Sequence, residues 1–236
     1  ETGIPITAGA ASRILVFLPG ETPAPSKPPY TSGSGTGGKN GTPAAQIAGT
    51  PFNVTVNATD GFWNLATSAA AVTLDAPDDL TPVGTGTQSL VAGTTNFSVT
   101  LFRAEDFNGF AQTITALAPA IVSPDYTSPA VTVFPDTAGA KKLRVMLPNE
   151  TRLAGTIAGK TGTPVGPASD THFIAGTPVT IRVDATDTWG NRLNLTPTVT
   201  FVTNDAFDLG DPRAAPLVAG TTSFDHIFVT ERTSDT

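Results

Sequence analysis

The stretch Phe52-Asn-Val-Thr-Val-Asn-Ala-Thr59 alternates apolar and polar side chains without a break. This period of two is typical of a β-strand with one buried face and one face in solvent. The same alternation returns in the stretch VTIRVDAT at residues 179–186, so that Phe52 corresponds to Val179, 127 residues further on. The sequence therefore predicts two copies of one half-buried strand.

Four further motifs occur twice at nearly the same spacing. They are AGTP at 48–51 and 175–178, LVAGTT at 90–95 and 217–222, Leu-Pro-x-Glu-Thr at 18–22 and 147–151, and Gly-Lys-x-Gly-Thr-Pro at 38–43 and 159–164. Self-similarity at one long period indicates homologous structural units in tandem. The separation changes only between motifs, which places the insertions in connecting loops.

Each unit reads as a series of short strands separated by Gly and Pro. In the first unit we expect strands at 13–18, 52–59, around Val72 and Leu74, at 88–91, 97–101, 112–116 and 129–134. About seven short strands with turn signals between them are typical of an immunoglobulin-like β-sandwich. The predicted fold is therefore all-β, with two tandem immunoglobulin-like β-sandwich domains.

The repeat also predicts the domain boundaries. We expect a tail of a preceding repeat or a linker at 1–12, the first unit at 13–134, a linker at 135–141 and the second unit at 142–236. Thr236 aligns with Gly109, so the second unit lacks counterparts of the last two predicted strands. We expect a fragment of a longer array; the alternative is that another chain supplies the missing strands, as in strand complementation.

One strand of the second unit, Phe224–Thr230, carries an apparent extra residue. A straight register would place His226 in the core, at the position of Val99 in the first unit. We predict instead a β-bulge near Asp225 and His226, which would return Ile227 and Val229 to the inner face.

Composition excludes several classes of function. The net charge is −7 with only 13 Lys and Arg, so no basic face is available for nucleic acid. There is no Cys, which excludes disulfides and thiol chemistry. The apolar runs are too short to insert into a membrane. We also find no recognisable carboxylate pair, nucleophile motif or complete phosphate-binding loop, and we predict that the protein is not an enzyme.

These turn and strand motifs resemble the bacterial immunoglobulin-like (Big-type) tandem repeats of large surface and adhesin proteins. The resemblance covers nearly the whole chain. It implies a non-catalytic structural or adhesive role as a stalk or spacer outside the cell, with neighbouring repeats as partners. A brief linker between rigid sandwiches would favour an extended arrangement.

We expect either no cofactor or a structural calcium ion, and two sets of polar residues are candidates for the calcium site. They are Asp184, Asp187 and Asn191 in the second unit, and Asn57, Asp60 and Asn64 in the first. Oxygen ligands three or four residues apart on a loop suit a hard cation. The alternative is that these Asp and Asn side chains only close their own turns.

The loop after the same strand carries a Trp in each unit, Trp63 and Trp189, one residue out of register. An exposed Trp could stack on a sugar ring and make this a glycan- or receptor-binding module on a host surface. Alternatively, the ring closes the end of the sandwich.

Lys39 and Lys160 occupy equivalent positions, which raises the alternative of a Lys–Asn isopeptide cross-link. We expect both lysines in Gly-rich loops and not in core strands, where desolvation would lower the amine pKa, and this argues against the cross-link. Besides the stalk and the glycan- or receptor-binding module, a third functional reading remains: a subunit of a surface filament or S-layer, completed by strand exchange with other copies of itself.

Overall fold

The computed structural model describes residues 3–123, 125–166, 172–205, 207–208 and 213–231. Every regular element in these ranges is a β-strand, so the predicted all-β class is confirmed. The chain divides into two compact units. Unit 1 comprises residues 1–104 and 109–134, and unit 2 comprises residues 105–108 and 135–236.

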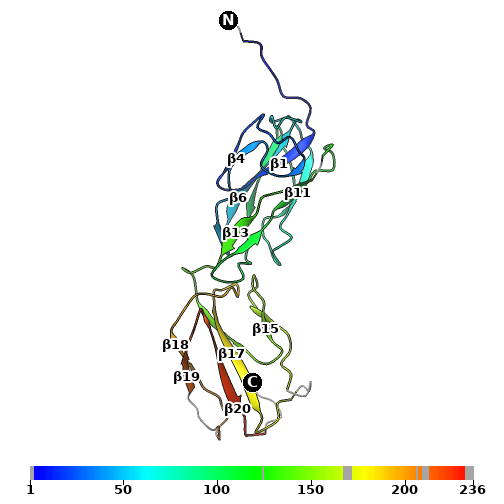
Figure 1. The fold of residues 1–236 in the computed structure, drawn as a ribbon. Helices are drawn as coiled ribbons and strands as arrows, with labels where there is room; N and C mark the ends of the chain where they lie inside the picture. Colours follow the sequence, from blue (N-terminus) through cyan, green and yellow to red (C-terminus); the bar gives the residue numbers. More distant parts are fainter. Residues whose placement is uncertain (1–2, 124, 167–171, 206, 209–212, 232–236) are drawn as a thin grey trace. The chain divides into compact units, whose positions relative to one another are not determined.

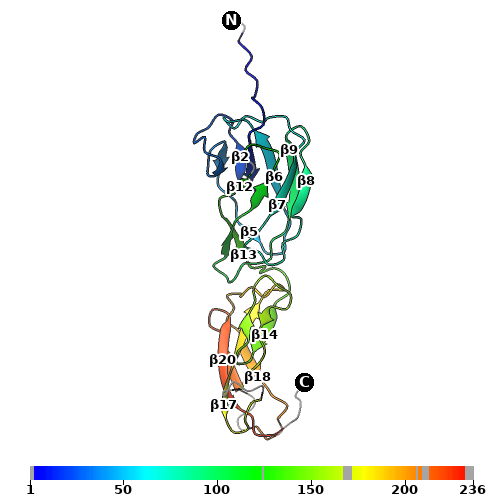
Figure 2. The same ribbon diagram turned by 90° about the vertical axis from the view of Figure 1, so that its right-hand side faces the viewer.

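Unit 1 contains thirteen of the strands. They are β1 (Arg13–Phe17), β2 (Glu21–Pro23), β3 (Gly33–Ser34), β4 (Lys39–Gly41), β5 (Gln46–Ile47), β6 (Phe52–Thr59), β7 (Ala71–Asp75), β8 (Gly86–Ser89), β9 (Thr94–Val99), β10 (Phe110–Gln112), β11 (Thr115–Leu117), β12 (Asp125–Thr127) and β13 (Val131–Phe134). One sheet has the order β1-β6-β9 and a second has the order β3-β12-β11-β7-β8 (Figures 1 and 2). A small sheet β10-β13-β5 and the two-stranded sheet β2-β4 complete the unit.

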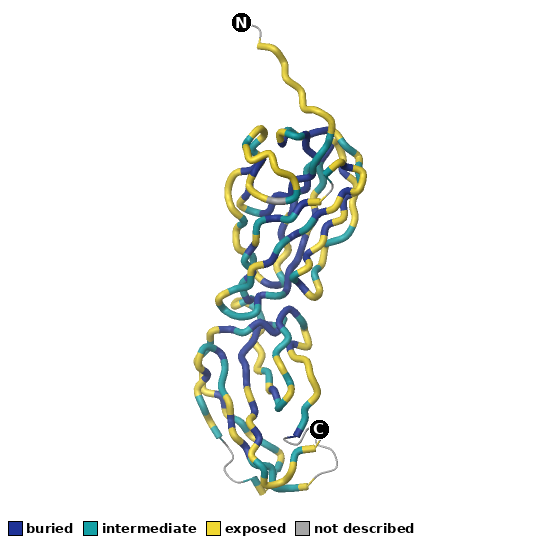
Figure 3. Tube along the Cα trace, turned by 45° about the vertical axis from the view of Figure 1, so that its right-hand side comes forward, coloured by how far each residue is buried: buried dark blue, intermediate teal, exposed yellow. Residues whose placement is uncertain are grey.

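The core of unit 1 lies between these sheets. β6 has the predicted bounds, and its alternate residues Val54, Val56 and Ala58 are completely buried. Figure 3 shows the buried segments running through the interior of each unit. Alternation therefore places one face of β6 in the core, as period-two patterning requires.

The predicted strand at 112–116 is in fact two strands in different sheets. β10 pairs with β13, whereas β11 pairs with β7 and β12. Between them, the backbone N–H and the hydroxyl of Thr113 both donate to Asp78 Oδ2 at 2.8 Å. These bonds hold the chain where it passes from one sheet to the other.

Unit 2 contains the other seven strands. They are β14 (Lys142–Met146), β15 (Thr151–Arg152), β16 (Lys160–Thr161), β17 (Pro178–Thr186), β18 (Thr198–Phe201), β19 (Arg213–Pro216) and β20 (Thr221–Ile227). β14-β17-β20 form one sheet, and β18-β19 and β15-β16 form two hairpins. The core includes Val183, Val199 and Phe224.

The repeated motif LVAGTT forms the same tight turn in both units. Val91 N–H bonds to Thr94 O at 2.8 Å, and Val218 N–H bonds to Thr221 O at 2.9 Å. The two central residues have positive φ in each copy, 50° and 89° in unit 1 and 49° and 79° in unit 2. Two successive positive φ values are typical of a type I′ hairpin turn, which explains the Ala-Gly pair at its centre.

The predicted bulge in the last strand of unit 2 is wrong. β20 pairs with β17 in straight register, with Val179 opposite His226, and His226 is completely buried. Its ring lies edge-on to Phe201 and Phe228, and Nε2 is 3.3 Å from Asp208 Oδ2. The imidazole therefore packs against two aromatic rings and lies beside a carboxylate, at the position that Val99 occupies in unit 1.

We expect the His226 and Asp208 side chains to be energetically coupled. His226→Val alone should lower the stability of unit 2 by about 1–3 kcal/mol, because it leaves the buried Asp208 carboxylate without its imidazole. Adding Asp208→Ala should recover most of that loss, because it also removes the buried carboxylate, to which the Thr203 hydroxyl donates. A double-mutant cycle in urea measures the coupling, and strictly additive losses would contradict it.

Candidate functional site

Two of the repeated motifs meet in space and form a buried ion pair in unit 1. Lys39 Nζ lies 2.8 Å from Glu21 Oε1, and it donates to Glu21 Oε2 and to Val16 O, both at 3.0 Å. Glu21 Oε2 also accepts the Leu18 N–H at 3.0 Å. The pairing of β2 with β4 brings the two side chains together. We call this arrangement the Lys–Glu clamp.

Unit 2 has the same clamp, built from the second copies of the same motifs. Lys160 Nζ lies 2.7 Å from Glu150 Oε1 and donates to Val145 O at 3.2 Å, and Leu147 N–H donates to Glu150 Oε2 at 2.9 Å. The environment differs, because the Lys160 side chain is 40% exposed while that of Lys39 is 1% exposed.

Burial changes the proton affinity of the clamp in unit 1. Desolvation lowers the pKa of Lys39, and the hydrogen bond and charge of Glu21 offset only part of that effect. The ring of Tyr126 lies 5.2 Å from Lys39 Nζ, and burial together with the Glu21 charge raises the pKa of its hydroxyl. Burying an ion pair in this way is costly unless both partners are present.

Sequence reasoning placed Lys39 and Lys160 in Gly-rich loops and did not find Glu21 or Glu150. Both lysines lie in short strands instead, β4 and β16. The amine of Lys39 contacts a Glu carboxylate and a main-chain carbonyl, and not an Asn side chain. Both units repeat a Glu in the motif Leu-Pro-x-Glu-Thr and a Lys in the motif Gly-Lys-x-Gly-Thr-Pro. This joint repetition was the signal that could have predicted the pairing of the two side chains.

The predicted calcium ligands of unit 1 all take part in hydrogen bonds. Asp60 Oδ1 accepts the N–H groups of Phe62 and Asn64 at 2.8 and 3.0 Å, and Oδ2 accepts Gly9 N–H at 3.0 Å. The Asn64 amide also donates to Asp60 Oδ2 at 3.0 Å. Asn57 Oδ1 accepts the Thr94 hydroxyl at 2.8 Å, so it joins neighbouring strands.

Unit 2 reproduces this arrangement. Asp187 Oδ1 accepts Trp189 N–H and Asn191 N–H, both at 2.9 Å, and Oδ2 accepts Asp136 N–H at 3.0 Å. Asp184 Oδ1 accepts the Thr221 hydroxyl at 2.7 Å, as Asn57 does in unit 1.

The acidic loops that follow β7 and β18 also bind main-chain N–H groups. Asp79 Oδ2 accepts Phe102 N–H and Arg103 N–H at 2.6 and 2.8 Å. Asp205 Oδ2 accepts Val229 N–H and Thr230 N–H at 2.8 and 3.0 Å. Hydrogen bonds, led by that from the Thr230 hydroxyl, lower the pKa of Asp205.

These contacts favour a turn-closing role for the carboxylates. Within the described ranges, no three His, Cys, Asp or Glu side chains gather in a way that could hold a metal ion. Calcium binding by the six residues named from the sequence stays a prediction.

The hydrogen bonds to Asp60 predict a loss of stability at acid pH. Desolvation alone would raise the pKa of Asp60, but the bonds from Asn64, Gly9 and Phe62 outweigh it, so the pKa lies below its ordinary value of 3.8. A carboxyl with a lowered folded-state pKa stabilises the fold above its unfolded pKa, and that contribution is lost as the pH falls through the folded pKa.

We therefore expect Asp60→Asn to destabilise unit 1 at pH 7 by about 1–3 kcal/mol, because the N–H donors lose a charged acceptor. The difference from the unchanged protein should shrink as the pH falls from about 4, the ordinary pKa of Asp in the unfolded chain, through the lowered folded-state pKa of Asp60. Urea unfolding from pH 3 to 7, followed by Trp63 fluorescence in a Trp189→Phe background, tests this. Asp187→Asn is the matched change in unit 2, and a difference independent of pH would contradict the prediction.

Trp63 lies inside unit 1. Its side chain is 3% exposed, its Nε1–H donates to Pro29 O at 2.9 Å, and the Arg13 guanidinium stacks 4.9 Å from the ring centre. Trp189 is half-buried. In this conformation Trp63 closes the end of the sandwich, and sugar binding through either Trp stays a prediction.

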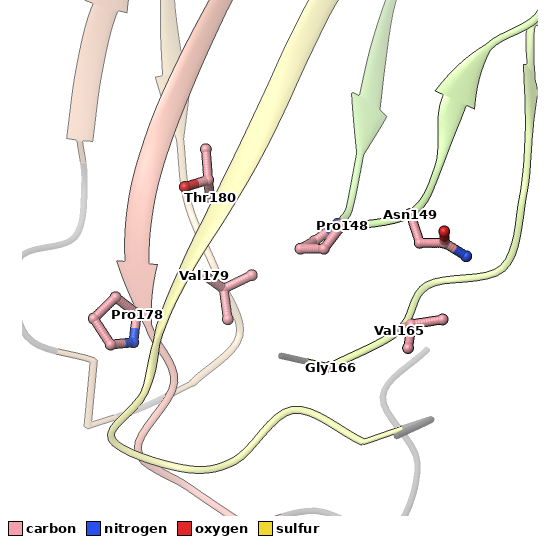
Figure 4. A pocket seen from close by; sticks show the side chains of 7 residues that line it. All are labelled: Pro148, Asn149, Val165, Gly166, Pro178, Val179 and Thr180. Carbon is pink, nitrogen blue, oxygen red and sulfur yellow. The ribbon is translucent and has the colours of Figure 1, made fainter. Parts of the chain in front are cut away.

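A groove of about 640 Å³ opens in unit 2 (Figure 4). Its lining is Pro148, Asn149, Val165, Gly166, Pro178, Val179 and Thr180. Figure 4 shows Pro148 pointing across the gap toward Val179 of β17, with Val165 farther along the same side as Pro148. The lining residues carry no charge, and Asn149 and Thr180 are the two with polar side chains.

No family model matches the chain, and no curated protein matches it. Among solved structures, fibronectin(III)-like modules of Clostridium thermocellum CbhA match with 10% sequence identity and a TM-score of 0.25, covering 79% of this chain and 75% of that one. In the described part of the chain, no helix is long and apolar enough to cross a membrane.

Proposed function

We propose that this chain is a non-catalytic structural repeat of a bacterial surface protein, related to Big-type immunoglobulin-like repeats and acting outside the cell as a stalk or spacer. The observation that carries the proposal is the role of the repeated motifs. In both units they build the same Lys–Glu clamp, the same Asp-closed loop and the same hairpin turn.

Each of these devices stabilises a strand or a turn. The residues shared by the two units are therefore used to maintain the fold, which is what a spacer requires. A catalytic or ligand-specific module would instead be expected to share reactive or recognition groups that remain open to solvent.

Small-angle scattering combined with the mass in solution tests the spacer role. A spacer predicts a monomer whose largest dimension approaches the summed lengths of two sandwich units. A compact particle would contradict it. A glycan array should show no binding; binding that is lost in Trp189→Ala would favour the recognition module instead.

Calcium is tested in the same preparation. Thermal unfolding with excess calcium and with chelator should give the same midpoint if the carboxylates only close turns. A ligand that binds only the folded state raises the midpoint, and once it is in excess over its Kd the stabilisation grows with the logarithm of its concentration. A calcium-dependent rise that is lost in Asp187→Asn would establish a structural calcium site.

A further inference from the structure

One face of unit 2 that should belong to the core is open. Leu143 and Val145 of β14 pair directly with Ala185 and Val183 of β17, so they lie on the same face as these core residues. Leu143 is nevertheless 56% exposed and Val145 is 45% exposed. Apolar side chains on an inner sheet face are normally covered by a second layer.

Unit 1 shows what covers this face. The counterparts of Leu143 and Val145 are Ile14 and Val16 of β1, which are 1% and 0% exposed. β11 and β12 pack against β1. Their inward residues Ala116 and Tyr126 are 2% and 1% exposed.

The strand edge that would hold this cover is free in unit 2. In unit 1, β7 bonds to β8 on one edge and to β11 on the other, with Leu74 opposite Ala116. Its counterpart β18 pairs with β19 alone among the described strands. A hollow of about 270 Å³ lies beside it, lined by residues that include Leu143, Leu195 and Val199. An unpaired edge next to an open apolar face is a template for an added strand.

The ion pair and the groove of Figure 4 agree with this comparison. Lys39 is covered by the ring of Tyr126, whereas its counterpart Lys160 is 40% exposed. In unit 1, the Ala48 N–H donates to Phe134 O of β13. For the counterpart of Ala48, Ala175, no acceptor is found within the described residues. The groove is lined by Pro178, Val179 and Thr180, which follow Ala175 within five residues.

We propose that this face of unit 2 is an acceptor site for the terminal strands of a repeat unit, that is, for an extended segment with the chemistry of residues 110–134. Its β11-like part pairs antiparallel with the free edge of β18. Its Tyr126-like side chain covers Val145 and the Lys160–Glu150 pair. Its β13-like part enters the groove beside Val179. This goes beyond the spacer role, because a spacer does not need an acceptor site.

The segment itself is suited to this site. Residues 110–134 contain one charged side chain, Asp125, and otherwise consist of apolar and small polar residues. Lys141 and Lys142 line the hollow beside β18, so the acceptor is positive where the donor is weakly negative. Val131 and Val133 are completely buried in unit 1, which shows that the β13 part provides core surface.

A synthetic peptide of residues 110–134, added to the whole chain, tests the proposal. We expect a one-to-one complex and a rise of about 4 °C or more in the thermal midpoint of unit 2 at saturating peptide, with unit 1 unchanged. A peptide carrying Ala116→Asp and Tyr126→Asp should bind at least tenfold more weakly. On the chain, Val145→Asp should abolish the shift, while Val218→Asp, a change at a 70% exposed turn residue, should leave it intact.

Circular dichroism of the Val145→Asp chain shows whether β14 still folds, and Val145→Thr provides a milder change at the same position. An unchanged midpoint with the unaltered peptide would overturn the proposal, and so would equal binding of the two peptides. A chain that is dimeric without peptide, and that the peptide does not dissociate, would also overturn it and would assign the face to a second copy.

Discussion

Lys39→Met is expected to lower the free energy of unfolding of unit 1 by about 3–5 kcal/mol, the range for a buried ion pair that loses one partner. The substitution retains most of the apolar stem but leaves the Glu21 carboxylate, whose side chain is 1% exposed, without a counter-charge. Only the Leu18 N–H would still donate to it.

The same substitution in unit 2 is the matched control. Lys160→Met should cost about 1 kcal/mol or less, because that amine is 40% exposed and water already screens the pair. Adding Glu21→Gln to Lys39→Met should recover much of the loss, because a neutral amide still accepts from Leu18 without a buried charge. Urea unfolding resolved by unit measures all three. Equal losses in the two units would show that burial does not set the strength of the clamp.

Trp63→Ala should destabilise unit 1 by about 3–5 kcal/mol, the usual cost of removing a large buried aromatic side chain. The ring is almost fully enclosed and its Nε1–H bonds to Pro29 O. Trp63→Phe should cost less, because it retains most of the apolar area.

Backbone conformation at this position adds a finer test. Trp63 has a φ of 68°, in the left-handed region that glycine adopts most easily, and its counterpart in unit 2 is Gly190, with a φ of 75°. Trp63→Gly should therefore be less destabilising than Trp63→Ala by about 0.5–1 kcal/mol. Thermal unfolding of the three variants gives the order. If Trp63→Ala hardly changed the stability of unit 1, the ring would not close the end of the sandwich, and an exposed aromatic platform would be favoured instead.

The alternation of apolar and polar residues was sufficient to predict the strands in which it is strict. β6 could be predicted to the residue, because each of its side chains follows a period of two. The passage of the chain from one sheet to another near Thr113 could not be predicted, because it depends on hydrogen bonds to Asp78, 35 residues away. The straight register at His226 depends in the same way on Asp208 and on the rings of Phe201 and Phe228.

The candidate site shows the same limit. Repetition identified the Asp60 and Asp187 loops, but a spacing of oxygen atoms is the same whether they face a cation or main-chain N–H groups. The clamp was missed because its two halves lie on separate motifs, 18 residues apart in unit 1. Trp63 was predicted in the correct loop, and only its packing shows that it is a lid.

The two units are built from the same strands and turns, but one face of unit 2 is open. Amide hydrogen exchange of the intact chain tests both statements. We expect slow exchange at Thr73 and Leu74 of β7, which are paired on both edges, and clearly faster exchange on the edge of β18 that has no partner among the described strands. β14 should likewise exchange faster than β1, while β6 and β17 should both be strongly protected. Equal protection of β7 and β18 would show instead that the edge of β18 is already covered, and that this face of unit 2 is not open.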